Sequence, residues 1–381
     1  MLTLYQNYYQ ALKRFLKFFW IGSTILLVIV YTLSCFTPII SPAKFALMGF
    51  LGLAFPILFL ALVVTLLIWL WANRRIAFLL ILILCLGYKN ISTLFAWNKA
   101  ATFSMQKAAG NIRILGYNVR GFDTKDKRLG LSNGYRSKML DYIKSQQADI
   151  ICIQDFSEFH DSIFPSNTHY LTDTLGYPYY YIAGDYKEST PWGETESGIA
   201  LFSKIPLHNI QHLSYPGKHV PESMILADVT VDGRTKRLIV THLQSMHLKK
   251  IDPKEKEPWQ SNQDSAIIYS KSVVKKLDFF IPYHAQQSEF VRKQIDESPY
   301  PVIFSADMNE VPTSYAYNRI KGNLHDVFLM KGRGLGQTYY RISPTLRIDY
   351  FLVSPSVKVV QYKKDDIFMS DHYPQVMDIE W

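Results

Sequence analysis

The first hundred residues are dominated by long apolar runs, a pattern typical of helices that cross a membrane. A membrane-spanning helix needs about 20 mostly apolar residues, and residues 18–40 and 45–71 each form a run of that length. A third apolar run covers residues 76–88 and continues less cleanly to residue 97. The pattern predicts about three transmembrane helices, with a buried or interfacial helix as the alternative for the third. The first run is too long for a cleaved signal peptide.

Basic residues predict how these helices are oriented. Arg74 and Arg75 separate the second and third runs, whereas Lys44 is the only basic residue between the first and second. Three more precede the first run: Lys13, Arg14 and Lys17. Because cytoplasmic loops collect Lys and Arg, the N-terminus and the Arg74–Arg75 turn are expected inside. Three crossings then put the rest of the chain outside the cytoplasm. If the third run does not cross, the rest is cytoplasmic.

From residue 111 the chain consists of short β-rich runs, several bounded by Gly, Pro, Asn or Asp as strands usually are. The expected strands are residues 112–117, 150–153, 198–202, 238–241, 302–305, 348–353 and 376–379. Apolar positions at helical spacing predict helices at residues 135–145, 265–280 and 286–294. Many strands with a few helices are typical of stacked sheets covered by helices. We therefore divide the chain into a membrane anchor, residues 1–99, and a second domain, residues 100–381.

Two segments of the second domain are expected to be loops. Residues 248–263 are polar and contain Pro, which favours an exposed loop, with a substrate- or lipid-facing loop as the alternative. Residues 177–181, together with Trp192, form an aromatic-rich loop. Its rings belong either to ordinary packing or to the rim of a substrate site.

The positive charge of the chain is concentrated in the anchor. Residues 1–99 contain eight Lys and Arg and no Asp or Glu, and the whole chain has a net charge of +9. The remaining residues carry 33 Lys and Arg against 32 Asp and Glu, which is close to neutral. Bulk charge therefore does not indicate a nucleic-acid-binding surface on the second domain, although a local basic patch stays open.

Polar side chains recur at or near the ends of the predicted strands. They are carboxylates, amides and imidazoles: Asn118, Asp155, His242, Asp307, Asn309, Asp349, Asp371 and His372. Asp307 and Asn309 are two residues apart, so in an extended chain they would point the same way. Mg²⁺ prefers carboxylate and amide oxygens, and a His held by a carboxylate can take the proton of an attacking water. The set therefore predicts hydrolysis of phosphate esters with Mg²⁺ or Mn²⁺ as cofactor.

The ordered motifs of the second domain resemble those of the endonuclease/exonuclease/phosphatase superfamily, which has the deoxyribonuclease I-like fold. The motifs are LGYNVRGF, ADIICIQD, SGIALFSK, VTHLQS, SADMNEVP, RIDYFLV and SDHYP. The resemblance covers residues 111–381 and implies an α+β fold, a four-layer α/β/β/α sandwich of two packed mixed sheets flanked by helices. Three spans before such a domain also resemble a common bacterial arrangement. It implies a multi-pass protein of the bacterial inner membrane with a periplasmic catalytic domain.

The resemblance also implies roles for the site residues. Asn118, Asp155 and Asp371 would bind the metal. His372 would be the general base, and Asp349 would orient it.

The remaining roles concern the phosphate. His242 would hydrogen-bond the scissile phosphate or act as an acid. Asp307 and Asn309 would bind the phosphate, the nucleophilic water or a second metal. Glu196, which precedes SGIALFSK, is a looser match that would orient His242.

One position departs from the pattern of the family, which usually has Glu where Asp155 stands. Asp is shorter by one methylene, about the 1.5 Å of a C–C bond. The metal would then shift inward, or a water would fill the gap. Glu158, three residues further on, is an alternative ligand.

Three functions remain open at this point. The favoured one is a membrane-tethered phosphodiesterase or phosphatase that acts on a lipid headgroup, a nucleotide or a sugar phosphate. The second is a nuclease acting on DNA or RNA, for which the near-neutral domain is mildly unfavourable because nucleic-acid binding depends on Lys and Arg. The third is a catalytically inactive, membrane-bound binding module, against which His242 and the Asp371–His372 pair argue.

Overall fold

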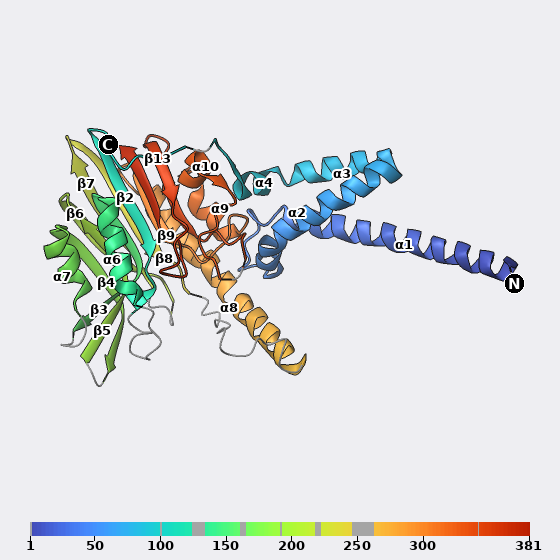
Figure 1. The fold of residues 1–381 in the computed structure, drawn as a ribbon, viewed down its shortest axis with the longest axis horizontal. Coiled ribbons are helices and arrows are strands. Elements are labelled where there is room, and N and C mark those ends of the chain that lie inside the picture. The colour runs from blue at the N-terminus through green and yellow to red at the C-terminus, as the bar shows by residue number, and fades with distance from the viewer. Residues whose placement is uncertain are drawn as a thin grey trace.

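Apolar helices extend from one end of a body built on two sheets (Figure 1). The computed structural model describes residues 2–99, 101–123, 134–160, 165–190, 193–217, 222–245, 263–341 and 343–381. The extending helices are α1 (Leu2–Ser34), α2 (Leu47–Ala72), α3 (Arg74–Leu86) and α4 (Tyr88–Leu94). By length and composition α1 and α2 can each cross a membrane, and α3 with α4 makes a third candidate span if the pair counts as one.

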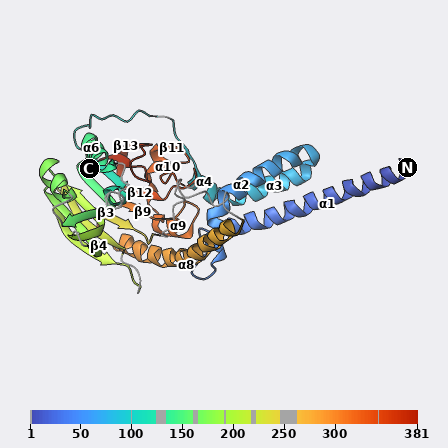
Figure 2. The ribbon, with the colours of Figure 1, turned by 60° about the horizontal axis from the view of Figure 1, so that its bottom comes forward.

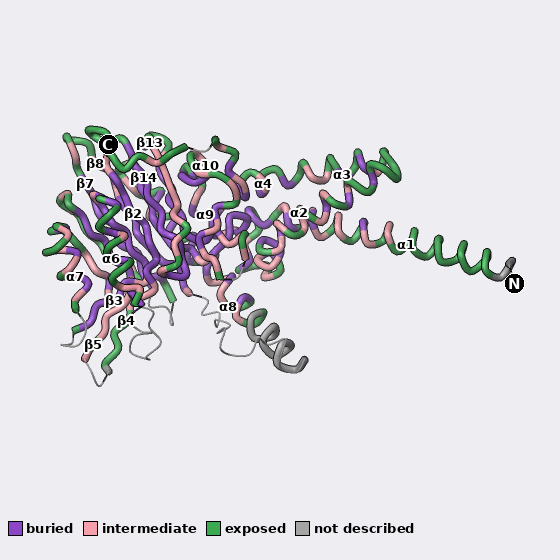
Figure 3. The backbone as a smooth tube through the Cα atoms, in the orientation of Figure 1, coloured by how far each residue is buried: buried purple, intermediate pink, exposed green. Residues whose placement is uncertain are grey.

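The helices keep apolar side chains on their outer surface. Figure 3 shows long exposed stretches on α1 and α3, in contrast to the buried strands of the body. Ile57 is 73% exposed and Trp71 is 96% exposed. Water is a poor solvent for such a surface, and lipid would solvate it better. Two apolar helices are therefore plausible membrane anchors.

A bend of 67° separates α3 from α4 at Gly87. A Cβ atom at this position would lie 2.0 Å from the hydroxyl of Tyr31 on α1, so only Gly permits the close approach of these helices. Helix α3 has 13 residues, about 20 Å at the rise of an α-helix, so α3 alone is shorter than the hydrocarbon core.

Two six-stranded mixed sheets form the body. The first has the order β13 (Lys358–Lys364), β14 (Gln375–Glu380), β2 (Asn111–Asn118), β3 (Ile150–His160), β5 (Gly193–Ser203) and β4 (Tyr179–Thr190). The second has the order β10 (His325–Asp326), β12 (Asp349–Val353), β9 (Val302–Asp307), β8 (Arg234–His242), β7 (Ser223–Val231) and β6 (Leu207–Ser214). In each sheet one central pair is parallel, β2 with β3 and β8 with β9.

Helices cover the outer face of each sheet (Figures 1 and 2). The first sheet carries α6 (Tyr135–Gln146), and the second carries α8 (Gln263–Asp296) and α9 (Tyr315–Lys321). The shorter elements are η1 (Arg120–Asp123), α7 (Asn167–His169), η2 (Tyr170–Thr174), α10 (Val327–Lys331), β1 (Ala96–Trp97) and β11 (Arg333–Gly334).

Three apolar layers hold this architecture together. Because side chains alternate along a strand, Ile114 of β2 packs between the sheets while its neighbour Leu115 packs under α6. On the other sheet, Val240 of β8 faces the inter-sheet core and Ile239 faces α8 and α9. Central strands buried on both faces produce continuous apolar runs. The predicted four-layer α/β/β/α sandwich is confirmed.

Six of the seven expected strands and the helix at residues 135–145 lie within observed elements. The seventh, residues 348–353, begins one residue before β12. Two expectations were wrong. Residues 179–181 of the expected aromatic loop begin β4, and Trp192 lies outside the described residues. The two helices expected after residue 265 form the single helix α8, which continues through Pro282. Its buried stripe, Leu277, Ile281 and Ala285, stays in register across the Pro, so packing outweighs the lost hydrogen bond. The expected loop at residues 248–263 lies outside the described part of the chain, apart from Gln263.

The helical region is joined to the body through the loop that follows β9. Thr37, after α1, donates a hydrogen bond from its hydroxyl to the carbonyl of Thr313 (2.7 Å). The hydroxyl of Thr313 in turn donates to the carbonyl of Gly52 on α2 (2.7 Å), and Thr93 donates to the carbonyl of Pro312 (3.2 Å). We call these contacts the Thr313 seam. Strand β1 also pairs with β11.

Candidate active site

Asp307 lies at the centre of the polar side chains, at the end of β9. The parallel pairing of β8 with β9 aligns His242 with Asp307, and the antiparallel pairing of β12 aligns Asp349 with it from the other side. Strand register alone therefore gathers three of the predicted residues at one edge of the second sheet. All three are buried.

The carboxylate of Asp307 connects both sheets. Its Oδ2 accepts a hydrogen bond from Nδ2 of Asn118 on β2 (2.9 Å). The same oxygen lies 3.5 Å from Nε2 of His242 and 3.6 Å from Nε2 of His372. Burial first, and then the charge of Asp349, raise the pKa of Asp307 to about 6, although the two imidazoles oppose the shift. The fold thus holds a carboxylate where it is costly to ionise.

His372 and Asp349 form a pair with a defined orientation. Nδ1 of His372 lies 2.9 and 3.1 Å from the two carboxylate oxygens of Asp349, and the ring of Tyr339 packs edge-on against the imidazole at 5.0 Å. This arrangement turns Nε2 toward Asp307. Burial disfavours the imidazolium, but Asp349 and Asp307 outweigh burial and raise the pKa of His372 to about 10. The pair has the geometry of a base and the carboxylate that orients it.

Asn309 reaches the site by a turn and not, as expected, along an extended strand. Strand β9 ends at Asp307, and Asn309 has a φ of 49°, a left-handed conformation that Asn tolerates better than most residues. Its backbone N–H donates to Oδ1 of Asp307 (2.9 Å). Its Nδ2 lies 3.0 Å from Nε2 of His242 and donates to the carbonyl of Leu243 (3.0 Å). The turn still brings Asp307 and Asn309 against the same His.

Asp155 lies in a β-bulge of β3, where the register with β5 shifts between Ile153 and Phe156. Its φ of 51° is left-handed, and such strain is common at functional positions. Oδ1 of Asp155 lies 3.5 Å from Nδ1 of His242, and the side chain is 48% exposed. Burial opposes charge on His242, but Asp155 and Asp307 together raise its pKa. Asp155 is thus the solvent-facing member of the cluster.

Two guanidinium groups flank Asp371. Oδ2 of Asp371 lies 3.7 Å from Nε of Arg120 and 3.7 Å from Nε of Arg341. Ser370 donates to the carbonyl of Asn118 (2.8 Å), which fixes this loop beside the end of β2. The motif GYNVRGF contains Arg120, whereas Arg341 lies outside every motif. Sequence reasoning missed both as site residues.

The other acidic residues lie apart from His242 or support it. Glu196 pairs with Lys187 (3.4 Å) and His160 (3.8 Å), so its orienting role toward His242 stays a prediction. Glu158 accepts from the backbone N–H groups of residues 167 and 168 at the start of α7. It therefore serves the fold there, and the structure gives no support to it as an alternative metal ligand.

Buried Glu222 was not identified from the sequence as a residue of the site. It accepts hydrogen bonds from Gln244 (3.1 Å) and from the backbone of Ser245 (3.3 Å), just after His242. Nδ1 of His284 on α8 lies 2.8 Å from Glu310, and its Nε2 lies 2.7 Å from the carbonyl of Gln244. Both residues therefore support the segment that carries His242.

The carboxylate and amide oxygens at this site are suitable ligands for a hard divalent cation. Asn118 donates through Nδ2 to Asp307, so Oδ1 is the atom of this side chain that can bind a metal. The carboxylates of Asp155 and Asp371 complete the predicted set. Within the described ranges, one group of three His, Cys, Asp or Glu side chains offers ligand atoms within 4.8 Å of one another: Asp307, Asp349 and His372. Because both oxygens of Asp349 face Nδ1 of His372, we interpret that pair as base and orienting group, not as metal ligands.

Comparison with known proteins gives the family. A sequence model of the Endonuclease/Exonuclease/phosphatase family matches residues 115–372, about two thirds of the chain. The chain belongs to this family, whose members are usually hydrolases of phosphate esters and commonly use divalent metals. A second model, Domain of unknown function (DUF8431), matches residues 16–94. No curated protein sequence matches the chain.

Several solved structures are similar to the chain. They include an endonuclease/exonuclease/phosphatase from Beutenbergia cavernae (19% identity, TM-score 0.49), the human nocturnin catalytic domain with bound sulfate (18%, 0.46) and humanized D. rerio TDP2 (16%, 0.46). Each match covers 71% of this chain, and the matches cover 71%, 93% and 99% of those chains respectively.

Proposed function

We propose that this protein is a divalent-metal-dependent hydrolase of phosphate esters, tethered to a membrane by residues 1–99. The observation that carries the proposal is the convergence of both imidazoles and Asn118 on the carboxylate of Asp307. A structural role explains this cluster poorly, because buried charges cost stability unless a function retains them. Perturbed pKa values gathered at one site point the same way.

The residues take the following roles in the proposal. His372, oriented by Asp349, accepts the proton of the attacking water. His242 and Asn309 hydrogen-bond the phosphate or the leaving oxygen. Mg²⁺ or Mn²⁺, held by Asn118, Asp155 and Asp371, would supply positive charge beside the phosphate oxygens.

A nuclease is the second candidate, and the Arg120–Arg341 pair favours it. Guanidinium groups form bidentate hydrogen bonds with phosphates. The guanidinium of Arg341 also lies over the ring of Tyr340 (5.7 Å), and that ring stacks on the ring of Tyr373 (5.5 Å). Aromatic rings beside such a pair suit a stacked base. The salt dependence of substrate binding separates the two candidates, because a polynucleotide contacts several phosphates and loses affinity steeply with salt.

The proposed topology is multi-pass, in the bacterial inner membrane, with the catalytic domain in the periplasm. Its support is that α2 runs away from the body and α3 returns toward it (Figure 1). If α1 and α2 cross, the Arg74–Arg75 turn and the N-terminus share the far side, as the distribution of basic residues predicts. An alkaline phosphatase fused to the C-terminus should then be active. An inactive fusion beside an active cytoplasmic reporter would reverse the orientation.

Hydrolysis of bis-p-nitrophenyl phosphate by the full chain tests the proposed chemistry. We expect turnover that requires Mg²⁺ or Mn²⁺, and that His372→Ala reduces by about 10²–10⁴-fold, the usual contribution of a general base. The matched control is His325→Ala, an exposed His of β10, which should keep full activity. Equal loss in both variants, or none in either, would reject His372 as the base. Complete inactivity of the folded wild-type chain would favour the binding module.

A further inference from the structure

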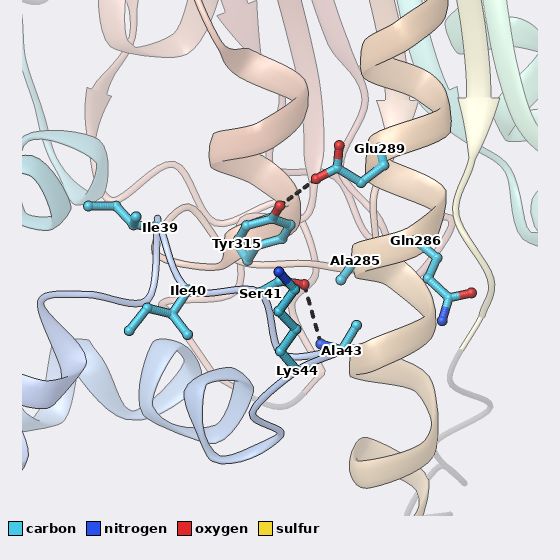
Figure 4. A pocket seen from close by; sticks show the side chains of 9 residues that line it. All are labelled: Ile39, Ile40, Ser41, Ala43, Lys44, Ala285, Gln286, Glu289 and Tyr315. Carbon is cyan, nitrogen blue, oxygen red and sulfur yellow. Dashed lines mark hydrogen bonds between the residues drawn. The ribbon is translucent and has the colours of Figure 1, made fainter.

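A cavity of about 480 Å³ lies where the membrane helices meet the body, away from the polar cluster around Asp307. Three segments line it (Figure 4): the connection between α1 and α2, one face of α8, and Tyr315 at the start of α9. Helix α8 runs close to the base of α2, because a Cβ atom on Gly49 would lie 2.2 Å from Ile281. The cavity is therefore part of the joint between the two regions.

The charges of this cavity favour an anionic ligand. Glu289 is already neutralised, since the hydroxyl of Tyr315 donates to it and Nε of Arg319 lies 2.7 Å from its other oxygen. Lys44, by contrast, makes no ion pair with any residue that the structure describes, and in Figure 4 its side chain extends toward Tyr315. The uncompensated charge at the cavity is thus one ammonium group, which attracts a phosphate.

The cavity is also amphipathic. Ile39 is 65% exposed and Ile40 is 37% exposed on the side of the α1–α2 connection, and Phe36 and Phe45 beside them are 47% and 49% exposed. Gln286 and Tyr315 supply polar groups on the side of α8 and α9, and Ser41 supplies one next to Ile40 in the connection. If α1 and α2 cross a bilayer, their connection lies at its surface, where headgroups meet acyl chains. The distribution of apolar and polar walls therefore matches the two parts of a lipid.

We propose that this cavity binds one phospholipid of the surrounding bilayer, with its phosphate against Lys44 and its acyl chains along Ile39 and Ile40. The proposal rests on the membrane insertion put forward above and adds a second, non-catalytic phosphate site. The bound lipid lies next to two supports of the active site. Helix α8 carries His284, which contacts Glu310, and Tyr315 follows the loop that begins at Asn309. A seated lipid therefore favours the arrangement in which the Asn309 loop is held against His242.

The test is native mass spectrometry of the full chain, extracted in a mild detergent. We expect wild-type protein to keep one phospholipid, and Lys44→Glu to weaken its affinity for that lipid by about tenfold, equivalent to about 1.4 kcal/mol of binding, which lowers the retained fraction. Lys44→Gln removes the charge without reversing it and should cause a smaller loss. The matched control is Lys89→Glu in α4, an exposed Lys that does not line the cavity; it should keep the lipid.

Equal lipid retention in wild type, Lys44→Glu and Lys89→Glu would overturn the proposal, as would retention of detergent alone by the wild type. Competition by millimolar inorganic phosphate as effective as by added phospholipid would show that the acyl chains contribute nothing, which also overturns it. Variants are compared only when their thermal unfolding matches wild type. The readout is binding and does not depend on catalysis. A protein that keeps its lipid but hydrolyses no phosphate ester would contradict the proposed catalysis and still support this lipid site.

Discussion

Two buried polar regions of the molecule are built on opposite principles. The cluster around Asp307 brings together carboxylates and imidazoles, and burial and neighbouring charges displace the pKa values of Asp307, His372 and His242. The Thr313 seam contains only hydroxyls and carbonyls, each donor matched to an acceptor. Charged groups held together out of water cost stability, whereas neutral, satisfied hydrogen bonds add to it. The cluster around Asp307 is therefore suited to acid–base chemistry, and the Thr313 seam is suited to attaching the helical region to the body.

One short loop belongs to both regions. Asn309 touches His242 at its start, and Thr313, four residues on, binds the carbonyl of Gly52 on α2. Helix α2 therefore holds one end of the loop that carries Asn309. Substitutions at the two ends should separate activity from stability, and the following predictions exploit that contrast.

The largest effect is expected for Asp307→Asn. The substitution keeps the shape but removes the charge that both imidazoles face, so turnover should fall by about 10³-fold, the scale of an electrostatic catalytic group. Stability should move the other way. The folded-state pKa of Asp307 is raised to about 6 from 3.8, so its contribution to stability is present below pH 3.8 and is lost as the pH rises through about 6.

Thermal unfolding of the metal-free protein across this pH range checks the claim. The amide nitrogen of Asn cannot accept one of the two hydrogen bonds that Asp307 receives from Asn118 and Asn309, so the pH trend of the difference is the readout. The unfolding temperature of Asp307→Asn relative to that of wild type should rise from low pH to pH 8. A relative unfolding temperature that does not rise across this range would show that ionised Asp307 does not cost stability, and the contrast with the seam would fail.

Asp349→Asn should have the next largest effect, about 10²-fold on turnover, through loss of the orientation of His372. The sign of its pH effect follows from the geometry. The Asp349 carboxylate stabilises the imidazolium of His372 and helps to raise its pKa to about 10, so the Asn variant should have a lower pKa there. The acidic limb of the pH profile of kcat/KM, where the base is protonated, should move to lower pH. A limb that stays in place would assign it to another group.

Much of this arrangement could be predicted, because short stretches of the sequence determine it. Asp307, Asp349 and His242 lie at the ends of strongly apolar strands, and strand register converts those positions into proximity. Other features have no local signal. The partners Thr313 and Gly52 are 261 residues apart in sequence, and Arg341 lies in a segment without regular structure. Strand β6 is mostly exposed and polar, so it contains no apolar run from which a strand could be predicted. Such features depend on tertiary contacts that periodicity does not encode.

Asp155→Glu should change metal binding more than structure. The side chain of Asp155 is 48% exposed, so one more methylene has room to extend. If the short carboxylate is a weakened ligand, the Glu variant should bind Mg²⁺ more tightly, by up to about tenfold, or 1.4 kcal/mol. Activity titrated against Mg²⁺ measures this, with Asp155→Asn as the variant expected to bind more weakly. A large loss of activity in the Glu variant would show that the bulge of β3 has adapted around Asp.

The smallest and most specific effect is expected at the seam. Thr313→Val keeps the volume of the side chain but leaves the carbonyl of Gly52 without its donor, at a cost of about 1–2 kcal/mol for a buried unsatisfied group. Thr313→Ser restores the hydroxyl and should recover most of that loss. Thermal unfolding in detergent gives the stability change, and the turnover of both variants should stay within a few-fold of wild type because no site residue is altered. A loss of turnover in Thr313→Val as large as in Asp349→Asn, rescued by Thr313→Ser, would show that the anchor sets the position of Asn309. The two polar regions would then form one functional unit and not two.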